Sequence, residues 1–304
     1  MRKWLNRRNR RLEIPIINPR VSDGLLINIF SWNQGGTHQH WIDLLDKACT
    51  SRPHLLLFAT AECGGVLPNI TGQVNLVSSW TRRLNDRLIE DFHLVCNSRR
   101  QGIVISVWAS NQNCRLMESS HMDLTWDSSG RKAGVFVQFS FMDMIFSFVA
   151  VHFDAVRLKE RTRQLRKVLE GVSSFKHESD VIIVVGDMNF RIDQERRAVC
   201  NATRLGASDS LLAGDQLFKL LKINTHWLAG WREAAEPSFL PTYKLKTIGK
   251  GYDFASGRLP AFTDRILIRS DTRLVVNTLE YTRMETNGGS DHSPIFARIM
   301  ITDC

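Results

Sequence analysis

Polar side chains that suit metal and phosphate chemistry stand where apolar runs of the chain end. The run LLINIFSWN ends at Asn33, LLLFATAE ends at Glu62 and IFSFVAVH ends at His152. Asn, carboxylates and imidazole at the ends of buried strands cost free energy unless they are paired or bind an ion. Each one alone is compatible with a cap, a turn or core packing, but their repetition favours a shared site.

Three motifs later in the chain continue this pattern. VIIVVGDMN carries Asp187 and Asn189, PAFTDRILI carries Asp264, and GGSDHSPI carries Asp291 and His292. Oxygen ligands without cysteine suit Mg²⁺, with Mn²⁺ as an alternative, better than they suit zinc. A divalent ion, a carboxylate and an imidazole together serve in-line attack of water on a phosphate ester. The residue types therefore predict a magnesium-assisted phosphoester hydrolase.

The elements that must position these residues are mostly strands. Apolar or alternating segments predict strands at 25–32, 55–60, 92–97, 103–109, 135–140, 145–152, 181–186, 265–269, 272–281 and 295–301. Helical patterns fall at about 38–49, 78–90, 157–175 and 209–222. Strands that follow each other directly predict antiparallel hairpins within mixed sheets. We expect an α/β sandwich in which two mixed, mainly antiparallel sheets pack face to face with helices outside them.

The composition fits one enzyme-sized body. With 304 residues, 43% hydrophobic and 23% charged, the chain can bury a large core and is neither disordered nor a coiled coil. Its six cysteines form no CxxC pair, which favours reduced thiols in the cytoplasm over a disulfide framework. No apolar run is long enough to span a bilayer. We expect a basic arm at 1–20 and a single catalytic domain at 21–304.

The basic arm holds most of the excess charge. Residues 1–20 carry seven Lys or Arg against Glu13 alone, and the whole chain has a formal net charge of +9. Such an arm can bind an anionic membrane, which would make the protein peripheral to membranes, or a phosphate-bearing polymer. The alternative is a solvated arm without a partner, and a mitochondrial presequence is disfavoured because the arm lacks Ser.

The order of the motifs resembles a known superfamily. From about residue 24 to 301, WN, E, H, GDMNFR, TDR and SDH are similar to the endonuclease/exonuclease/phosphatase superfamily, which has a deoxyribonuclease I-like fold. IVVGDMNFR and RLPAFTDRI resemble the two signatures of inositol polyphosphate 5-phosphatases, and FLPTYK resembles their loop that grips the ring phosphates. The resemblance implies a four-layer α/β/β/α sandwich. It also implies Mg²⁺-dependent hydrolysis of the 5-phosphate of phosphoinositides or soluble inositol polyphosphates by in-line attack of an activated water.

The same resemblance implies roles for the catalytic residues. Asp187 orients and deprotonates the attacking water, and Asn189 holds the nucleophile or a phosphoryl oxygen. His292 donates to the scissile phosphate with Asp264 as its partner, and His152 contacts the same phosphate.

It also implies the ligands of the ion and of the substrate. Glu62 binds the ion directly, Asn33 completes its shell and Asp291 lies toward the metal side. The substrate-facing residues are Tyr243, Lys244 and Arg258 for the 4-phosphate, together with Lys132 and Arg191. Arg191 and Arg265 are expected to orient the catalytic and metal-binding groups by salt bridges.

Departures from the family pattern concern specificity more than catalysis. Ser256 stands where members that prefer 4,5-bisphosphorylated substrates carry a Lys, so dependence on a 4-phosphate is expected to be relaxed unless Lys246 or Lys250 substitutes for it. Two other functions remain as alternatives. The first is a nuclease of the same superfamily acting on DNA or RNA, favoured by the basic arm. The second is a binding protein with a dead site, which the intact set of site residues disfavours.

Overall fold

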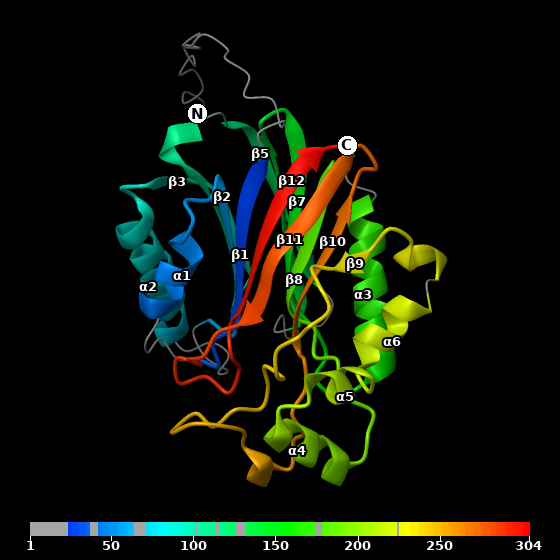
Figure 1. Ribbon diagram of the computed structural model, residues 1–304. Coiled ribbons are helices and arrows are strands. Elements are labelled where there is room, and N and C mark those ends of the chain that lie inside the picture. Colours follow the sequence, from blue (N-terminus) through cyan, green and yellow to red (C-terminus); the bar gives the residue numbers. More distant parts are fainter. Residues whose placement is uncertain are drawn as a thin grey trace, which may run out of the picture.

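Two sheets and the helices outside them make up the computed structural model (Figure 1). The structure describes residues 24–36, 42–63, 71–100, 102–113, 116–125, 132–173, 178–223 and 225–304. The basic arm predicted at 1–20 lies outside the described residues. Among the described residues, no helix combines the length and the apolar character needed to cross a membrane.

Within the described residues each sheet has six strands, and most neighbouring strands are antiparallel. The first has the order β11-β12-β1-β2-β4-β3 and the second the order β5-β6-β7-β8-β10-β9. Within the described chain only β1 with β2, and β7 with β8, pair in parallel. The bounds of the strands are β1 Leu25–Asn33, β2 Leu55–Ala61, β3 Phe92–Arg100, β4 Ile103–Ser110, β5 Leu116–Thr125, β6 Ala133–Phe141, β7 Met144–His152, β8 Val181–Asp187, β9 Arg232–Glu233, β10 Asp264–Ser270, β11 Leu274–Arg283 and β12 Ile295–Asp303.

Helices cover the outer face of each sheet. In Figure 1, α1 and α2 lie outside the first sheet, and α3 and α6 lie outside the second. The bounds of the helices are α1 Ile42–Cys49, α2 Thr71–Leu88, α3 Leu158–Ser173, α4 Arg196–Leu205, α5 Ser208–Leu212 and α6 Gln216–Lys222, with short 3₁₀ turns η2 Asn111–Asn113, η3 His226–Leu228 and η4 Phe254–Ser256.

The alternation of side chains along the strands builds the layers. On β1, Ile27 and Ile29 face the core between the two sheets, whereas Phe30 and Trp32 belong to the cluster under the helices, where they join Trp80 of α2. Successive strand residues point to opposite faces, so a strand buried on both faces reads as a continuous apolar run. The layers seen in these clusters confirm the predicted α/β sandwich.

Three elements escaped the sequence prediction, and one predicted helix is divided. β5, β9 and α4 were not expected, and the helix predicted at 209–222 is two helices, α5 and α6. The break falls at Ala213 and Gly214, after which the Asp215 side chain caps α6 by accepting a hydrogen bond from the Phe218 amide at 2.8 Å. Asp is a strong helix N-cap, and this capping bond explains why a new helix begins here.

The register of three strands brings polar residues to one end of the second sheet. His152 of β7 lies opposite Asp187 of β8, and Asp187 lies opposite Asp264 of β10. A Cβ on Gly186 would lie 2.2 Å from the Val151 carbonyl oxygen, and this glycine has φ +138°. Only glycine tolerates this backbone and this approach, so the residue before Asp187 is fixed by the packing of β7 on β8.

Candidate active site

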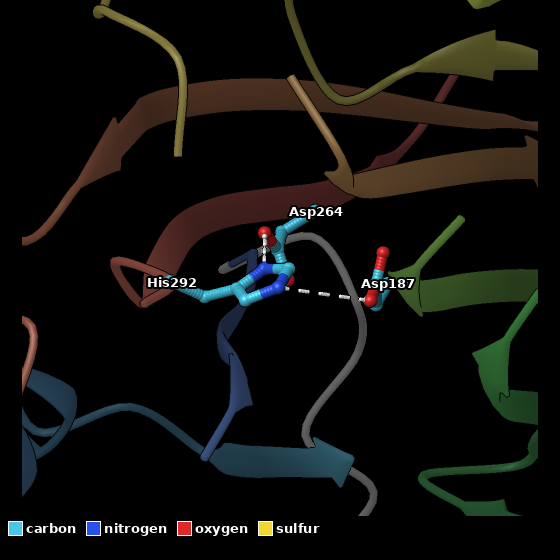
Figure 2. A group of neighbouring side chains, drawn as sticks. All are labelled: Asp187, Asp264 and His292. Atoms are coloured by element: carbon cyan, nitrogen blue, oxygen red, sulfur yellow. Dashed lines mark hydrogen bonds and ion pairs between the residues drawn. The ribbon is translucent and has the colours of Figure 1, made fainter. Parts of the chain in front are cut away.

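Asp187, Asp264 and His292 converge from three parts of the chain (Figure 2). The Nδ1 atom of His292 lies 2.9 Å from Asp264 Oδ2, and its Nε2 atom lies 4.0 Å from Asp187 Oδ2. His152 approaches the same Asp187 oxygen, with its Nε2 atom at 3.3 Å. All four side chains are buried. The predicted convergence of separate strand ends is therefore present in the fold.

Asp187 is held as a carboxylate. Its Oδ2 atom accepts a hydrogen bond from Asn33 Nδ2 at 2.9 Å, and its Oδ1 atom accepts one from the Asn189 amide at 3.0 Å. Burial would by itself raise the pKa of Asp187, but the hydrogen bond from His152 and the charges of His292, His152 and Lys132 outweigh burial and hold this pKa well below its usual range. Asp187 is consequently ionised at neutral pH.

Asp264 prepares His292 to carry a positive charge. Two hydroxyl groups, of Thr242 and Thr263, donate to Asp264 Oδ2 at 2.6 and 2.9 Å. Burial would lower the pKa of His292, but the nearby carboxylates, Asp264 first and Asp187 second, raise it from 6.5 to about 9. At neutral pH His292 is an imidazolium that can donate a hydrogen bond to an anion.

Asn189 takes a backbone conformation that is uncommon for a residue other than glycine. Its φ is +56°, its Nδ2 atom donates to the Phe153 carbonyl at 3.1 Å, and its Oδ1 atom accepts a hydrogen bond from Arg191. Asn enters this left-handed region more readily than most residues, and strained conformations cluster at active sites. The turn after β8 thus holds the Asn189 side chain between the Phe153 carbonyl, which directly follows β7, and the side chain of Arg191.

Asn33 and Glu62 offer oxygen atoms at the ends of neighbouring strands, Asn33 as the last residue of β1 and Glu62 directly after β2. Asn33 pairs with Ala61 in the parallel register of β1 and β2, which places Glu62 beside it. Glu62 is partly exposed, with φ +50° and its Oε1 atom 3.6 Å from His152 Nε2. Asn33 Oδ1 accepts from the Gly35 amide at 3.1 Å and retains a second lone pair. This hard donor set fits a divalent cation such as Mg²⁺.

Asp187, Asp264 and His292 also offer atoms within 4.8 Å of one another, which is close enough for a metal. The nearby carboxylates raise the pKa of His292, with Nδ1 2.9 Å from Asp264 Oδ2, so the charged ring is a hydrogen-bond donor. Metal ligands must be deprotonated. We therefore interpret this group, the relay, as a hydrogen-bonded Asp264–His292 pair beside the Asp187 carboxylate. Glu62 and Asn33 stay the predicted ligands of an ion.

The predicted substrate residues surround the relay to different degrees. Lys132 Nζ contacts His152 Nε2, and burial lowers the pKa of this lysine although Asp187 and Glu62 oppose the effect. Lys244 forms an ion pair with Asp291 at 2.7 Å. Their roles toward a substrate stay predictions.

Three arginines that share these motifs lie in different surroundings. Arg191 lies over the ring of Tyr243, with 4.7 Å between its Cζ atom and the ring centre, and Arg258 is exposed after η4. Arg265 is fully buried and donates to Asp215 at 2.7 Å and to Glu233 at 2.5 Å. Arg265 therefore forms ion pairs, but with Asp215 and Glu233 and not with the catalytic residues that it was expected to orient.

Sequence reasoning missed the hydroxyl groups that support the site. Besides Thr242 and Thr263, Ser290 donates to the Asn33 carbonyl at 2.7 Å and accepts from the His292 amide at 3.1 Å. All three hydroxyls lie inside the quoted motifs PTYK, TDR and SDH. A Ser or Thr close to an Asp or His within such a motif could have indicated a hydroxyl group that supports the site.

Comparisons with known proteins show the family and the fold of the chain. Residues 30–298 match the Endonuclease/Exonuclease/phosphatase family 2. A probable inositol polyphosphate 5-phosphatase of Schizosaccharomyces pombe is 24% identical over 293 residues, which cover 86% of this chain and 24% of that protein. The chain thus spans about a quarter of the length of this relative.

Two solved structures share the fold with TM-scores of 0.77. One is the inositol polyphosphate 5-phosphatase domain of SPsynaptojanin in complex with inositol (1,4)-bisphosphate and calcium, 21% identical, covering 92% of this chain and 86% of that one. The other is a Cimex nitrophorin in a ferrous NO complex, also 21% identical, covering 92% and 99%. The predicted resemblance is confirmed, and the chain belongs to the Endonuclease/Exonuclease/phosphatase family 2.

Proposed function

We propose that this chain is a Mg²⁺-dependent phosphatase that removes the 5-phosphate of phosphoinositides or soluble inositol polyphosphates. One observation carries the proposal: the Asp187 carboxylate lies among the side chains of Asn33, His152 and His292. The relatives named as 5-phosphatases support the substrate class. The fold alone does not decide it, since the Cimex nitrophorin with the same fold is described with ferrous iron and NO.

Asp187 orients the attacking water. Before substrate binds, the surrounding positive groups keep its pKa too low for it to be a strong base. A bound phosphate would neutralise His292, His152 and Lys132, because its oxygens face the same cations. The pKa of Asp187 then rises toward the value that a general base needs, so that proton removal from water is coupled to substrate binding.

His292 stabilises the charge that develops on the phosphoryl oxygens. As an imidazolium fixed by Asp264, it donates its Nε2 proton without reorganisation when the reaction occurs. His152 and Lys132 add donors from the ends of β7 and β6. His152 ends β7, Lys132 directly precedes β6, and His292 is held by its bridge to Tyr243 and its bond to Asp264, which favours a fixed geometry.

Glu62 and Asn33 would hold the ion on the open side of the relay. When bound, a divalent ion supplies positive charge to the phosphate oxygens and lowers the pKa of a coordinated water. Asp291, already paired with Lys244, would remain beside this side of the site.

We also propose a cytoplasmic enzyme that reaches membranes through its basic arm. The proposal rests on the charge of residues 1–20, since anionic lipids attract clustered Lys and Arg.

Phosphate release from purified protein tests the proposed activity. We expect release from 5-phosphorylated inositides, both as free headgroups and in vesicles, that EDTA abolishes and Mg²⁺ restores. Headgroups identical except for the missing 5-phosphate serve as the matched control and should release no phosphate. Cleavage of DNA or RNA without release from any inositide would overturn the proposal in favour of the nuclease alternative.

A further inference from the structure

The ring of Tyr243 is enclosed by positively charged groups of the site. The guanidinium of Arg191 lies over it with Cζ 4.7 Å from the ring centre, and the Lys244 ammonium lies 5.5 Å from that centre. The imidazole of His292 packs against the same ring, with 4.7 Å between centres and 42° between planes. Only 9% of the residue is exposed. An aromatic face attracts cations, so each of these contacts is favourable.

The backbone of Tyr243 is fixed between two catalytic motifs. Its amide donates to the Ala261 carbonyl at 3.2 Å, and the Ala261 amide donates back at 2.8 Å. Tyr243 also forms an isolated β-bridge with His292, and the Ser293 amide donates to the Thr242 carbonyl at 2.8 Å. The tyrosine therefore has little freedom, and its ring presents a rigid wall to the His292 imidazole.

The function proposed for His292 requires that its imidazole ring does not rotate. Its Nδ1 atom must stay at Asp264 while its Nε2 atom points at the substrate phosphate, and rotation of the ring would break both contacts. The charged groups that face the ring are Asp264 from β10, Asp187 from β8 and Asp291 from its own loop. These carboxylates attract the charged ring, whereas Tyr243 packs against it with 4.7 Å between the ring centres.

The same ring connects the two halves of the site. Arg191 lies over Tyr243 while it donates to Asn189 Oδ1, and Asn189 in turn donates its amide to Asp187. The contacts run without a gap from the water-orienting carboxylate to the imidazole that holds the phosphate. Tyr243 is the link between the GDMNFR and SDH motifs.

We propose that Tyr243 is a positioning residue that acts through its ring: it fixes the His292 imidazole against Asp264 and couples it to Arg191. This inference rests on the proposed phosphatase function for its kinetic consequence. It differs from the role expected from family resemblance, a phosphate contact made by the tyrosine hydroxyl. The two roles predict opposite results for removal of the hydroxyl alone.

The test compares Tyr243→Phe with Tyr243→Leu. Phe keeps the ring and removes only the hydroxyl, so its kcat should exceed that of the Leu variant at least about 5-fold if the ring is what positions His292. Leu removes the ring, so kcat should fall about 10- to 100-fold, because a small misplacement of a catalytic group has an effect of this size, while KM should change less than about 3-fold. Tyr252→Leu is the control: Tyr252 is the other tyrosine of this segment, with its hydroxyl on the Pro241 carbonyl, and its loss should leave kcat within about 3-fold.

A second readout does not depend on activity. The imidazole N–H of His292 that faces Asp264 should give a proton NMR signal, assigned by its loss in His292→Asn. We expect the signal in metal-free wild type, in Tyr243→Phe and in Tyr252→Leu, and its broadening or loss in folded Tyr243→Leu. If wild type releases no phosphate, the proposed function fails while this comparison still tests the positioning role. An unchanged signal in Tyr243→Leu, or a Phe variant whose KM rises as much as that of the Leu variant, would overturn the inference.

Discussion

Asp264→Asn is expected to make the enzyme sensitive to alkaline pH. Asn keeps the size of the side chain and can still accept from Thr242 and Thr263, but it removes the carboxylate that contributes most to the raised pKa of His292. Wild-type His292, with a pKa raised from 6.5 to about 9, stays charged until the pH rises through about 9. Its contribution to phosphate binding is therefore present at pH 6 and at pH 8, and is lost above about pH 9.

The expected magnitude follows from the charged fraction. If the variant restored a pKa near 6.5, the imidazolium fraction at pH 8 would fall about 30-fold, from roughly nine tenths to a few hundredths, but at pH 6 it would fall less than about 2-fold. The wild-type difference of pKa corresponds to about 3 kcal/mol in favour of the charged form. We expect kcat to follow this fraction, with a large defect at pH 8 that acid largely reverses.

The assay is kcat for phosphate release between pH 5.5 and 9.5 at fixed Mg²⁺. Asp271→Asn is the matched control, because Asp271 follows the other end of the same strand and its partly exposed side chain pairs with Arg273. Its pH profile should coincide with that of wild type. A defect in Asp264→Asn that is equally large at pH 6 and pH 8 would show that the carboxylate does not act through the charge of His292.

Further predictions concern stability and the arm. Arg265→Ala leaves the buried carboxylates of Asp215 and Glu233 without their partner, so urea unfolding should show a loss of about 3–5 kcal/mol; a loss under about 1 kcal/mol would contradict this account. Gly186→Ala forces a Cβ against Val151, so it should destabilise the protein several times more than an ordinary surface change, or prevent folding. Gly171→Ala, whose Cβ meets no atom within 4 Å, should instead stabilise α3 by up to about 1 kcal/mol. Equal melting temperatures for the two variants would refute the packing argument. Deletion of residues 1–20 should weaken binding to anionic vesicles in a sedimentation assay and leave turnover of a soluble headgroup unchanged, and equal vesicle binding would remove the role proposed for the arm.

Strongly apolar strands were predictable, and weakly apolar ones were not. Val181–Asp187 and Leu55–Ala61 are buried along their whole length, so their sequences read as continuous apolar runs. β5, with the sequence LMESSHMDLT, mixes polar and apolar residues without such a run. β9 has two residues, too few for any pattern.

The site was predictable where a motif ends a strand. His152, Asp187 and Asp264 meet because register places them opposite one another, and each follows or begins an apolar run that the sequence displays. The buried partners of Arg265 were not predictable, because Asp215 and Glu233 come from a helix cap and a two-residue strand far along the chain. Such pairings depend on the tertiary fold and leave no local pattern.

In the proposed mechanism, these side chains direct one water and one divalent ion at the 5-phosphate. The most direct measurement is ³¹P NMR of an inositol polyphosphate during turnover by wild type and by Asp187→Asn. We expect the 5-phosphate resonance alone to disappear, dependent on Mg²⁺, at a rate at least about 10²-fold lower in the variant. Loss of another ring phosphate, or equal rates for the two proteins, would contradict this mechanism.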